Sequence, residues 1–244
     1  LLNSHISQVI GDEIHNIAAE TWFNTMHSLN AKYKWGITAT PNRSDGLTKV
    51  IHWATGPKIH VVPAEKLKDV LIKPTITYIP TKYKFPLIST NEYQDMISDL
   101  AEDEKRNSLI LSYVDKYAKV PGVLLCERLT QVAYLQSKLK QSVMLTSKMS
   151  KKDRATTMDL VKTGKKTLVV STYGLFSTGI DIPALENLYL CSPIKSEIKL
   201  RQSAGRLMRK SPGKTEARIF DFVDEKVSIL RNASYKRKRT LENL

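Results

Sequence analysis

Short apolar runs alternate with helix-forming stretches along this chain, and the alternation sets firm limits on the fold. In the first third, the runs 6–10, 34–39 and 59–62 are candidate strands, and 16–28 has the apolar spacing of a helix. Parallel strands need a crossover connection that is usually helical, so the pattern predicts a mostly parallel α/β sheet. Such sheets bind ligands at the carboxyl ends of their strands, where functional residues are therefore expected.

A basic segment at 73–86 interrupts this pattern. Pro74, Pro80 and Pro86 punctuate it, as prolines do in linkers and edge strands. The alternation then resumes, and we expect a second, doubly wound lobe. Its candidate strands are 123–126, 143–145, 167–171, 188–191 and 217–222, and its candidate helices are 92–117, 129–139, 151–162 and 198–208.

The charge balance of the chain indicates its class of partner. Its 244 residues include 38 Lys and Arg against 24 Asp and Glu, which gives a net charge of +14. This excess predicts a polyanionic partner such as nucleic acid. Cys126 and Cys191 lie far apart and outside any CxxC pair, which argues against a zinc site and suits a reducing cytoplasm. No apolar run has the length of a membrane span, so we expect no membrane partner.

Two adjacent acids follow the first candidate strand. Asp12 can hold Mg²⁺ directly or through water, because Mg²⁺ takes oxygen ligands and keeps several waters. Glu13 can orient and deprotonate an attacking water. A charged loop after a strand would look the same, so these two residues do not establish a catalytic site by themselves.

Hydroxyl side chains follow two further strands. Thr38-Ala39-Thr40-Pro41 closes the run 34–39, and its hydroxyls can bond to the acids of a neighbouring strand end. Ser171 and Thr172 follow the apolar residues 168–170, and together with the amides of the next loop they can hold a phosphate. Both segments are also compatible with ordinary turns after strands.

The stretch from Gln202 to Arg209 holds two arginines. Arg206 and Arg209 are three residues apart, so on one helix they would share a face, and Gly205 would allow a neighbour to approach closely. Two guanidinium groups on one face suit a phosphate chain whose charge grows in the transition state, as in the arginine fingers of nucleotide hydrolysis. The alternative is a pair of surface arginines.

The order of these segments carries more information than any one of them. Four motifs follow one another along the chain, each at a strand end or on the next helix: the acid pair, TATP, ST…GID and QxxGRxxR. This order resembles the motor core of superfamily 2 DExH helicases and translocases, in the XPB-like and type III restriction branch. The amino-acid sequence at 173–180 is most similar to that of phage recombination and branch-migration helicases. The motifs that match are II (12–15), III (38–40), IV (123–126), V (171–181) and VI (202–209).

The resemblance implies an α/β fold of two RecA-like lobes, the first of them incomplete. Its expected parts are the back half of lobe 1 at 1–72, lobe 2 with its entry linker at 73–224, and a basic tail at 225–244. ATP and Mg²⁺ are the implied cofactors, and DNA is the implied partner, with RNA less favoured.

The same resemblance implies a role for each motif residue. Asp12 would bind the metal, Glu13 would activate water, and Arg206 and Arg209 would reach the γ-phosphate. The residues expected to face the nucleotide also include Gly179, Asp181 and Gln202. Those expected to couple the nucleotide site to the nucleic-acid site are His15, Thr38, Thr40 and Gln202. Those expected to contact nucleic acid are Ser171, Thr172, Lys151, Lys152, Lys236 and Arg237. One departure is Thr178, which stands where relatives often carry Glu.

The loop that cradles phosphates in such motors, GxxxxGK[ST], does not occur in this sequence. The segment 163–167, TGKKT, lacks the earlier glycine and enters a strand. We therefore expect no ATP hydrolysis by this chain alone, and an exposed edge or face on the strands 6–10 and 34–39, because parallel sheets are normally covered on both faces. A restriction-system motor, an RNA helicase and a non-catalytic nucleic-acid-binding module remain as alternative functions.

Overall fold

The computed structural model describes residues 5–39, 41, 46–63, 66, 70–86, 90–180, 182 and 184–244. The chain divides into two compact units, Leu1–Pro63 and Ala64–Leu244, and each is described here by itself. The expected division was after residue 72, whereas this boundary lies at Pro63.

Unit 2 is built on a parallel sheet of six strands in the order β3-β8-β7-β4-β6-β5. The strands are β3 (Thr75–Pro80), β4 (Gly122–Cys126), β5 (Ser142–Leu145), β6 (Leu168–Thr172), β7 (Asn187–Leu190) and β8 (Arg218–Val223). Five of them match the expected runs. The sixth, β3, comes from the proline-punctuated segment, which is therefore an edge strand rather than only a linker.

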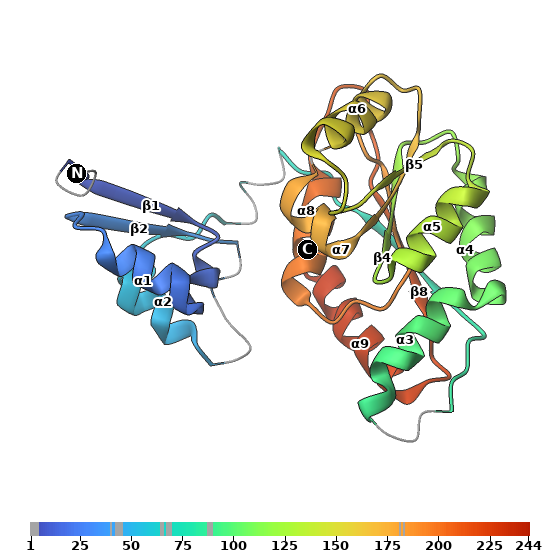
Figure 1. Cartoon of the computed structure of the whole chain (residues 1–244), viewed down its shortest axis with the longest axis horizontal. Helices are drawn as coiled ribbons and strands as arrows, with labels where there is room; N and C mark the ends of the chain where they lie inside the picture. The colour runs from blue at the N-terminus through green and yellow to red at the C-terminus, as the bar shows by residue number, and fades with distance from the viewer. Residues whose placement is uncertain are drawn as a thin grey trace. The chain divides into compact units, whose positions relative to one another are not determined.

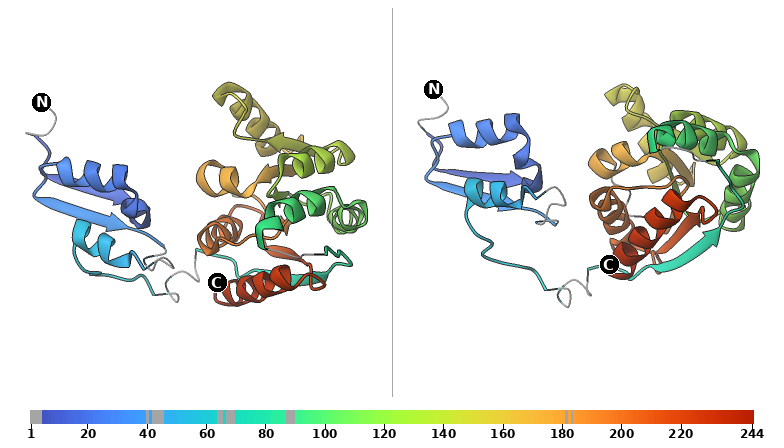
Figure 2. Two further views of the ribbon diagram at one scale, coloured as in Figure 1. Left: turned by 60° about the horizontal axis from the view of Figure 1, so that its bottom comes forward. Right: turned by 90° about the horizontal axis from the view of Figure 1, so that it is seen from below.

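Helices cover both faces of this sheet, as Figure 1 and Figure 2 show. They are α3 (Tyr93–Glu102), α4 (Glu104–Lys116), α5 (Leu129–Lys138), α6 (Lys151–Lys162), α7 (Tyr173–Gly179), α8 (Glu197–Met208) and α9 (Ser228–Glu242), with a short 3₁₀ turn, η3 (Thr90–Glu92), before α3. Alternate residues of β4 point to opposite faces: Val123 and Leu125 pack with α7 and α8, and Leu124 and Cys126 pack with α4 and α5. This arrangement confirms the doubly wound lobe.

Two helical regions of unit 2 differ from expectation. The stretch 92–117 is two helices rather than one, because Asp103 ends α3 and caps α4, with its Oδ1 accepting the Arg106 N–H at 2.6 Å. The expected tail is helix α9, which packs on the rest of unit 2 through Val227 and Leu230 against α3. The residues after 224 thus contribute buried side chains to the core of the unit, among them Val227, Leu230 and Leu241.

Unit 1 has two parallel strands, β1 (Gln8–Asp12) and β2 (Tyr33–Ile37), with η1 (Ile14–Ala18), α1 (Glu20–Ser28) and α2 (Thr48–Thr55). The helical segments pack on one face around Ile14 and Ile17. A Cβ at Gly36 would come within 2.9 Å of Ile14, so only glycine lets the strand approach that closely. Residues 58–63 form no strand, although an apolar run was expected to form one there.

The opposite face of this small sheet is exposed. Ile10, Trp35 and Ile37 are 57%, 41% and 57% exposed, and the register pairs Ile10 with Trp35. This confirms the expectation of an uncovered face on these strands. No helix among the described residues of the whole chain has the length and apolar character of a membrane span.

Candidate functional site

The acid pair of unit 1 lies where β1 ends. Asp12 is the exposed last residue of the strand, and its Oδ1 accepts the N–H of Glu13 at 2.9 Å. Glu13 has φ 49° and ψ 46°, a left-handed conformation that no other described non-glycine residue shares. For a residue with a side chain this conformation costs about 1–2 kcal/mol. Such backbone strain gathers at functional sites, so it marks this strand end.

A chain of polar contacts starts from Glu13. Its Oε2 lies 3.2 Å from Nδ1 of the buried His15, and the same Nδ1 lies 2.9 Å from Oγ1 of Thr38. A carboxylate only accepts hydrogen bonds, so Nδ1 donates to Glu13 in the tautomer that carries its proton there, and it accepts from the Thr38 hydroxyl in the other. The pairing of Asp12 with Ile37 across the two strands explains the contact, because it brings Thr38 beside residue 13.

Three of the residues expected to act together are therefore in contact: Glu13, His15 and Thr38. The remaining hydroxyl of that motif, on Thr40, lies outside the described residues.

The donor set at Asp12 suits one particular kind of metal. No group of three or more His, Cys, Asp or Glu side chains that could hold a metal ion occurs in the described part of the chain. A single exposed carboxylate with one oxygen engaged by the Glu13 amide suits Mg²⁺, which binds through one or two carboxylates and takes its other ligands from water and phosphates. Asp12 therefore fits a magnesium ion that arrives with a nucleotide, and does not fit a protein-enclosed metal cage.

In unit 2, the two hydroxyl residues at the end of β6 differ in burial. Ser171 is fully buried, and its Oγ donates to the carbonyl of Leu145 on β5 at 2.9 Å. The hydroxyl thus joins two strands inside the sheet, whereas the sequence predicted that it would contact nucleic acid. Thr172 is half-buried at the strand end and directly precedes α7. The segment expected as a loop is thus largely the helix α7.

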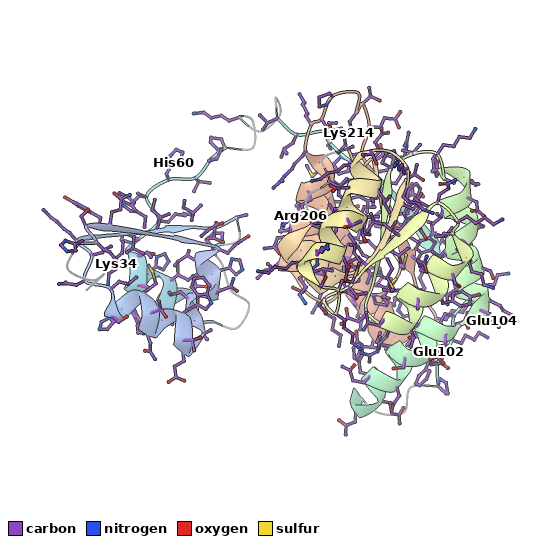
Figure 3. All side chains as sticks on the ribbon, turned by 45° about the horizontal axis from the view of Figure 1, so that its top comes forward. Lys34, His60, Glu102, Glu104, Arg206 and Lys214 are labelled. Atoms are coloured by element: carbon purple, nitrogen blue, oxygen red, sulfur yellow. The ribbon has the colours of Figure 1, made fainter. Side chains whose placement is uncertain are left out.

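Arg206 ties α8 to the end of α7. Its Nη1 donates to the carbonyl of Ile180 at 2.7 Å and its Nη2 to that of Ser177 at 3.0 Å. The guanidinium of Arg206, which Figure 3 labels, therefore bridges motif VI and motif V. Gln202 lies one turn earlier on α8 and is half-buried. Gly179 ends α7, and Asp181 lies outside the described residues.

Arg209 is the capping residue at the carboxyl end of α8, and its N–H donates to the carbonyl of Arg206 at 3.4 Å. The helix ends at Met208, and Arg209 has φ −59° and ψ 133°. It forms an antiparallel bridge with Leu71 and is exposed. Its bridge partner therefore comes from the segment of chain that enters unit 2, far away in the sequence.

The basic residues expected to contact nucleic acid also differ in burial. Lys151 and Lys152 open α6 and are exposed, as is Lys236 on α9. Arg237 is buried, and its Nη2 lies 3.0 Å from Oδ1 of Asp221. Burial raises the pKa of the Asp221 carboxyl above its usual value, and the arginine opposes that shift. Arg237 therefore anchors α9 to β8 and is not placed to contact phosphate.

Two buried cations were missed at the sequence level. Arg106 on α4 donates through Nε to Oδ1 of Asp224 at 2.8 Å and through Nη1 to the carbonyl of Cys191 at 2.5 Å. Lys214, between α8 and β8, donates to two backbone carbonyls at the end of α8. No local pattern marks either one, because their partners lie in other elements.

Comparisons with known proteins agree with the motif order. Residues 92–211 match the model of the helicase conserved C-terminal domain. The chain is 28% identical over 225 residues to a putative ATP-dependent RNA helicase of Acanthamoeba polyphaga mimivirus, covering 88% of this chain and 43% of that protein. It is 23% identical over 250 residues to the ATP-dependent DNA helicase uvsW of Enterobacteria phage T4, covering 96% of this chain and 49% of that protein.

The solved structure of T4 UvsW shares the fold, with a TM-score of 0.57 at 20% identity over 99% of this chain and 53% of that one. The chain thus spans about half the length of the curated relatives named above. This likeness supports the expected α/β fold, with the six-stranded sheet of unit 2 as a RecA-like lobe.

Proposed function

We propose that this chain is part of an ATP-dependent superfamily 2 helicase or translocase acting on DNA, supported by the match of residues 92–211 to the helicase conserved C-terminal domain and by its helicase relatives. One observation carries the proposal. The strained Glu13, directly after Asp12, is linked through His15 to Thr38 at the carboxyl end of the unit 1 sheet. That edge is where parallel α/β sheets act on their ligands.

In this proposal the acids of unit 1 divide the work. Asp12 offers a carboxylate oxygen to the magnesium ion of a bound nucleotide, and a magnesium ion, when present, neutralises phosphate charge. Glu13 orients the attacking water and takes its proton. His15, held between Glu13 and Thr38, passes a change at the carboxylate to the end of β2. Thr38 and Thr40 extend this link toward the nucleic-acid site.

The arginines of unit 2 act on the developing phosphate charge. Arg206 exchanges its bonds to the carbonyls of Ser177 and Ile180 for bonds to phosphate oxygens, which are stronger because both partners are charged. Arg209, exposed beyond the end of α8, contributes a second guanidinium. Gln202, Gly179 and Asp181 line the nucleotide from the same motifs. Thr172, Lys151, Lys152 and Lys236 contact the nucleic-acid backbone in this proposal.

DNA is the proposed substrate, supported by the likeness at 173–180 to phage recombination helicases and by the relative whose name gives DNA. RNA is the second candidate, supported by the mimivirus relative, whose name gives RNA. Stimulation of ATP hydrolysis by forked, duplex and single-stranded DNA, compared with RNA of the same sequence, separates the two. Stronger stimulation by RNA would overturn the choice of DNA.

The catalytic assignment is tested by Glu13→Gln in the complete protein. The substitution keeps the size of the side chain and removes the base, so we expect kcat for ATP to fall by roughly 10²–10⁴-fold, with nucleotide binding retained. The matched control is Glu20→Gln, which removes an exposed carboxylate from α1. An unchanged kcat in Glu13→Gln would contradict the role of Glu13. Magnesium-dependent ATP turnover by the 244-residue chain alone would contradict the expectation that it is inactive by itself.

A further inference from the structure

Lys214 occupies an unusual place for a lysine. It is buried, and its Nζ donates to the carbonyls of Leu207 and Arg209, the latter at 2.9 Å. Lysines are almost never fully buried unless their charge is paired. The partners here are backbone carbonyls at the end of α8, the part of a helix where carbonyls have no partner within the helix. Lys214, labelled in Figure 3, therefore holds the end of the motif VI helix.

A second segment holds the same place from the other side. Leu71 forms an antiparallel bridge with Arg209. The N–H of Ile72 donates to the carbonyl of Met208 at 2.7 Å, and that of Lys210 donates to the carbonyl of Val70 at 3.4 Å. Ile72 also packs against the core of unit 2. The stretch of chain that enters unit 2 is thus hydrogen-bonded directly to the segment that carries Arg209.

From these contacts we propose that Lys214 is a positioning residue for nucleotide hydrolysis. Lys214 and the segment Val70–Ile72 together form a clamp that fixes the backbone of Arg209 beyond the end of α8. The inference rests on the proposed function, since it assigns to the clamp the placement of a guanidinium that acts on phosphate.

The physical reason is the length of the arginine side chain. Four rotatable bonds separate its guanidinium from the backbone, so a displaced Cα changes every position that the group can reach. A misplacement of about 1 Å can lower a rate by about 10²-fold. Arg209 caps the end of α8, where its N–H donates to the carbonyl of Arg206 at 3.4 Å, which is long for such a bond. The bridge to Leu71 and the bond from Lys214 hold the same residue in addition.

The experiment measures nucleic-acid-stimulated ATP hydrolysis by the complete protein carrying Lys214→Met. Methionine keeps most of the length of the side chain and cannot donate to the two carbonyls. We expect kcat to fall by roughly 10–10²-fold with little change in KM, because the loss concerns the transition state rather than nucleotide binding. Arg209→Ala is expected to cost roughly 10³-fold or more. The double variant should be no slower than Arg209→Ala alone, since the clamp acts only through Arg209.

The control is Lys199→Met, which removes an exposed lysine from the same helix and should leave kcat near that of the unaltered protein. Hydrogen exchange of the Ile72 and Lys210 amides reports the clamp directly, and Lys214→Met should accelerate both. If Lys214→Met does not fold, Ile72→Pro tests the same clamp from the other side, because proline removes the N–H that bonds to Met208.

Three outcomes would overturn the proposal. Faster exchange of these amides with an unchanged kcat would show that the clamp does not position Arg209. A double variant far slower than Arg209→Ala would show that Lys214 acts by another route. An unchanged kcat in Arg209→Ala would remove the premise itself, and this result would refute the assigned role of Arg209 rather than the existence of the clamp.

Discussion

The two units contain the same kind of parallel sheet and cover it differently. Unit 2 buries its six strands between helices on both faces, whereas unit 1 packs its helices on one face and leaves Ile10, Trp35 and Ile37 exposed on the other. Both sets of strands have apolar sequences, as parallel strands do. The comparison teaches that an apolar strand sequence predicts a sheet face that favours burial. Whether the face is buried depends on the helices that pack against it, as they do on both faces in unit 2 and on one face in unit 1.

The largest expected effect is on independent folding. Residues 64–244 should unfold cooperatively by themselves, because the core of unit 2 is built entirely from its own residues. Residues 1–63 should lack cooperative unfolding, because two strands with one covered face bury too little apolar surface to offset the chain entropy lost on folding. Thermal denaturation followed by circular dichroism on the two separate segments checks this. A sharp transition in residues 1–63 would break the comparison.

A smaller effect is expected from a buried ion pair that unit 2 contains. Arg106→Met leaves the carboxylate of Asp224 buried without its partner, which should lower the free energy of unfolding of unit 2 by about 3–5 kcal/mol. The matched control is Arg201→Met, which breaks the surface pair with Glu197 and should cost less than about 1 kcal/mol. Denaturant unfolding of both variants gives the two values. Equal losses would mean that burial does not distinguish the pairs.

The smallest effect concerns pH. Burial lowers the pKa of Lys214 from its ordinary value of 10.5 to about 8, and the nearby Glu186 opposes the shift. Between these two pH values the unfolded chain binds more protons than the folded one, so the free energy of unfolding of unit 2 should rise with pH in that range. Lys214→Met should reduce this slope, and Lys199→Met should preserve it because Lys214 remains. Denaturant unfolding at pH 7.5, 9 and 10.5 provides the measurement. A slope that survives in Lys214→Met would contradict the burial of this charge.

Some residues of the candidate site were predicted from the sequence and others were not. The acid pair at Asp12 and Glu13 and the contact of their strand end with Thr38 followed from position alone, because the carboxyl ends of adjacent parallel strands meet at one edge. The arginine pair was found by its motif, whereas the bridge from Arg209 to Leu71 was not, because Leu71 lies in a distant part of the chain. Lys214 was not found, since its partners lie at the end of a different element.

The sequence by itself determined the alternation of strands and helices, the doubly wound class of unit 2 and the location of polar motifs at strand ends. Each of these depends on apolar periodicity and on residues close together in the chain. Only the tertiary structure decided that the Ser171 hydroxyl bonds to Leu145, that Arg237 pairs with Asp221, and that Arg209 pairs with Leu71. The physical reason is that a buried polar group must find a partner, and packing brings that partner from a distant part of the chain.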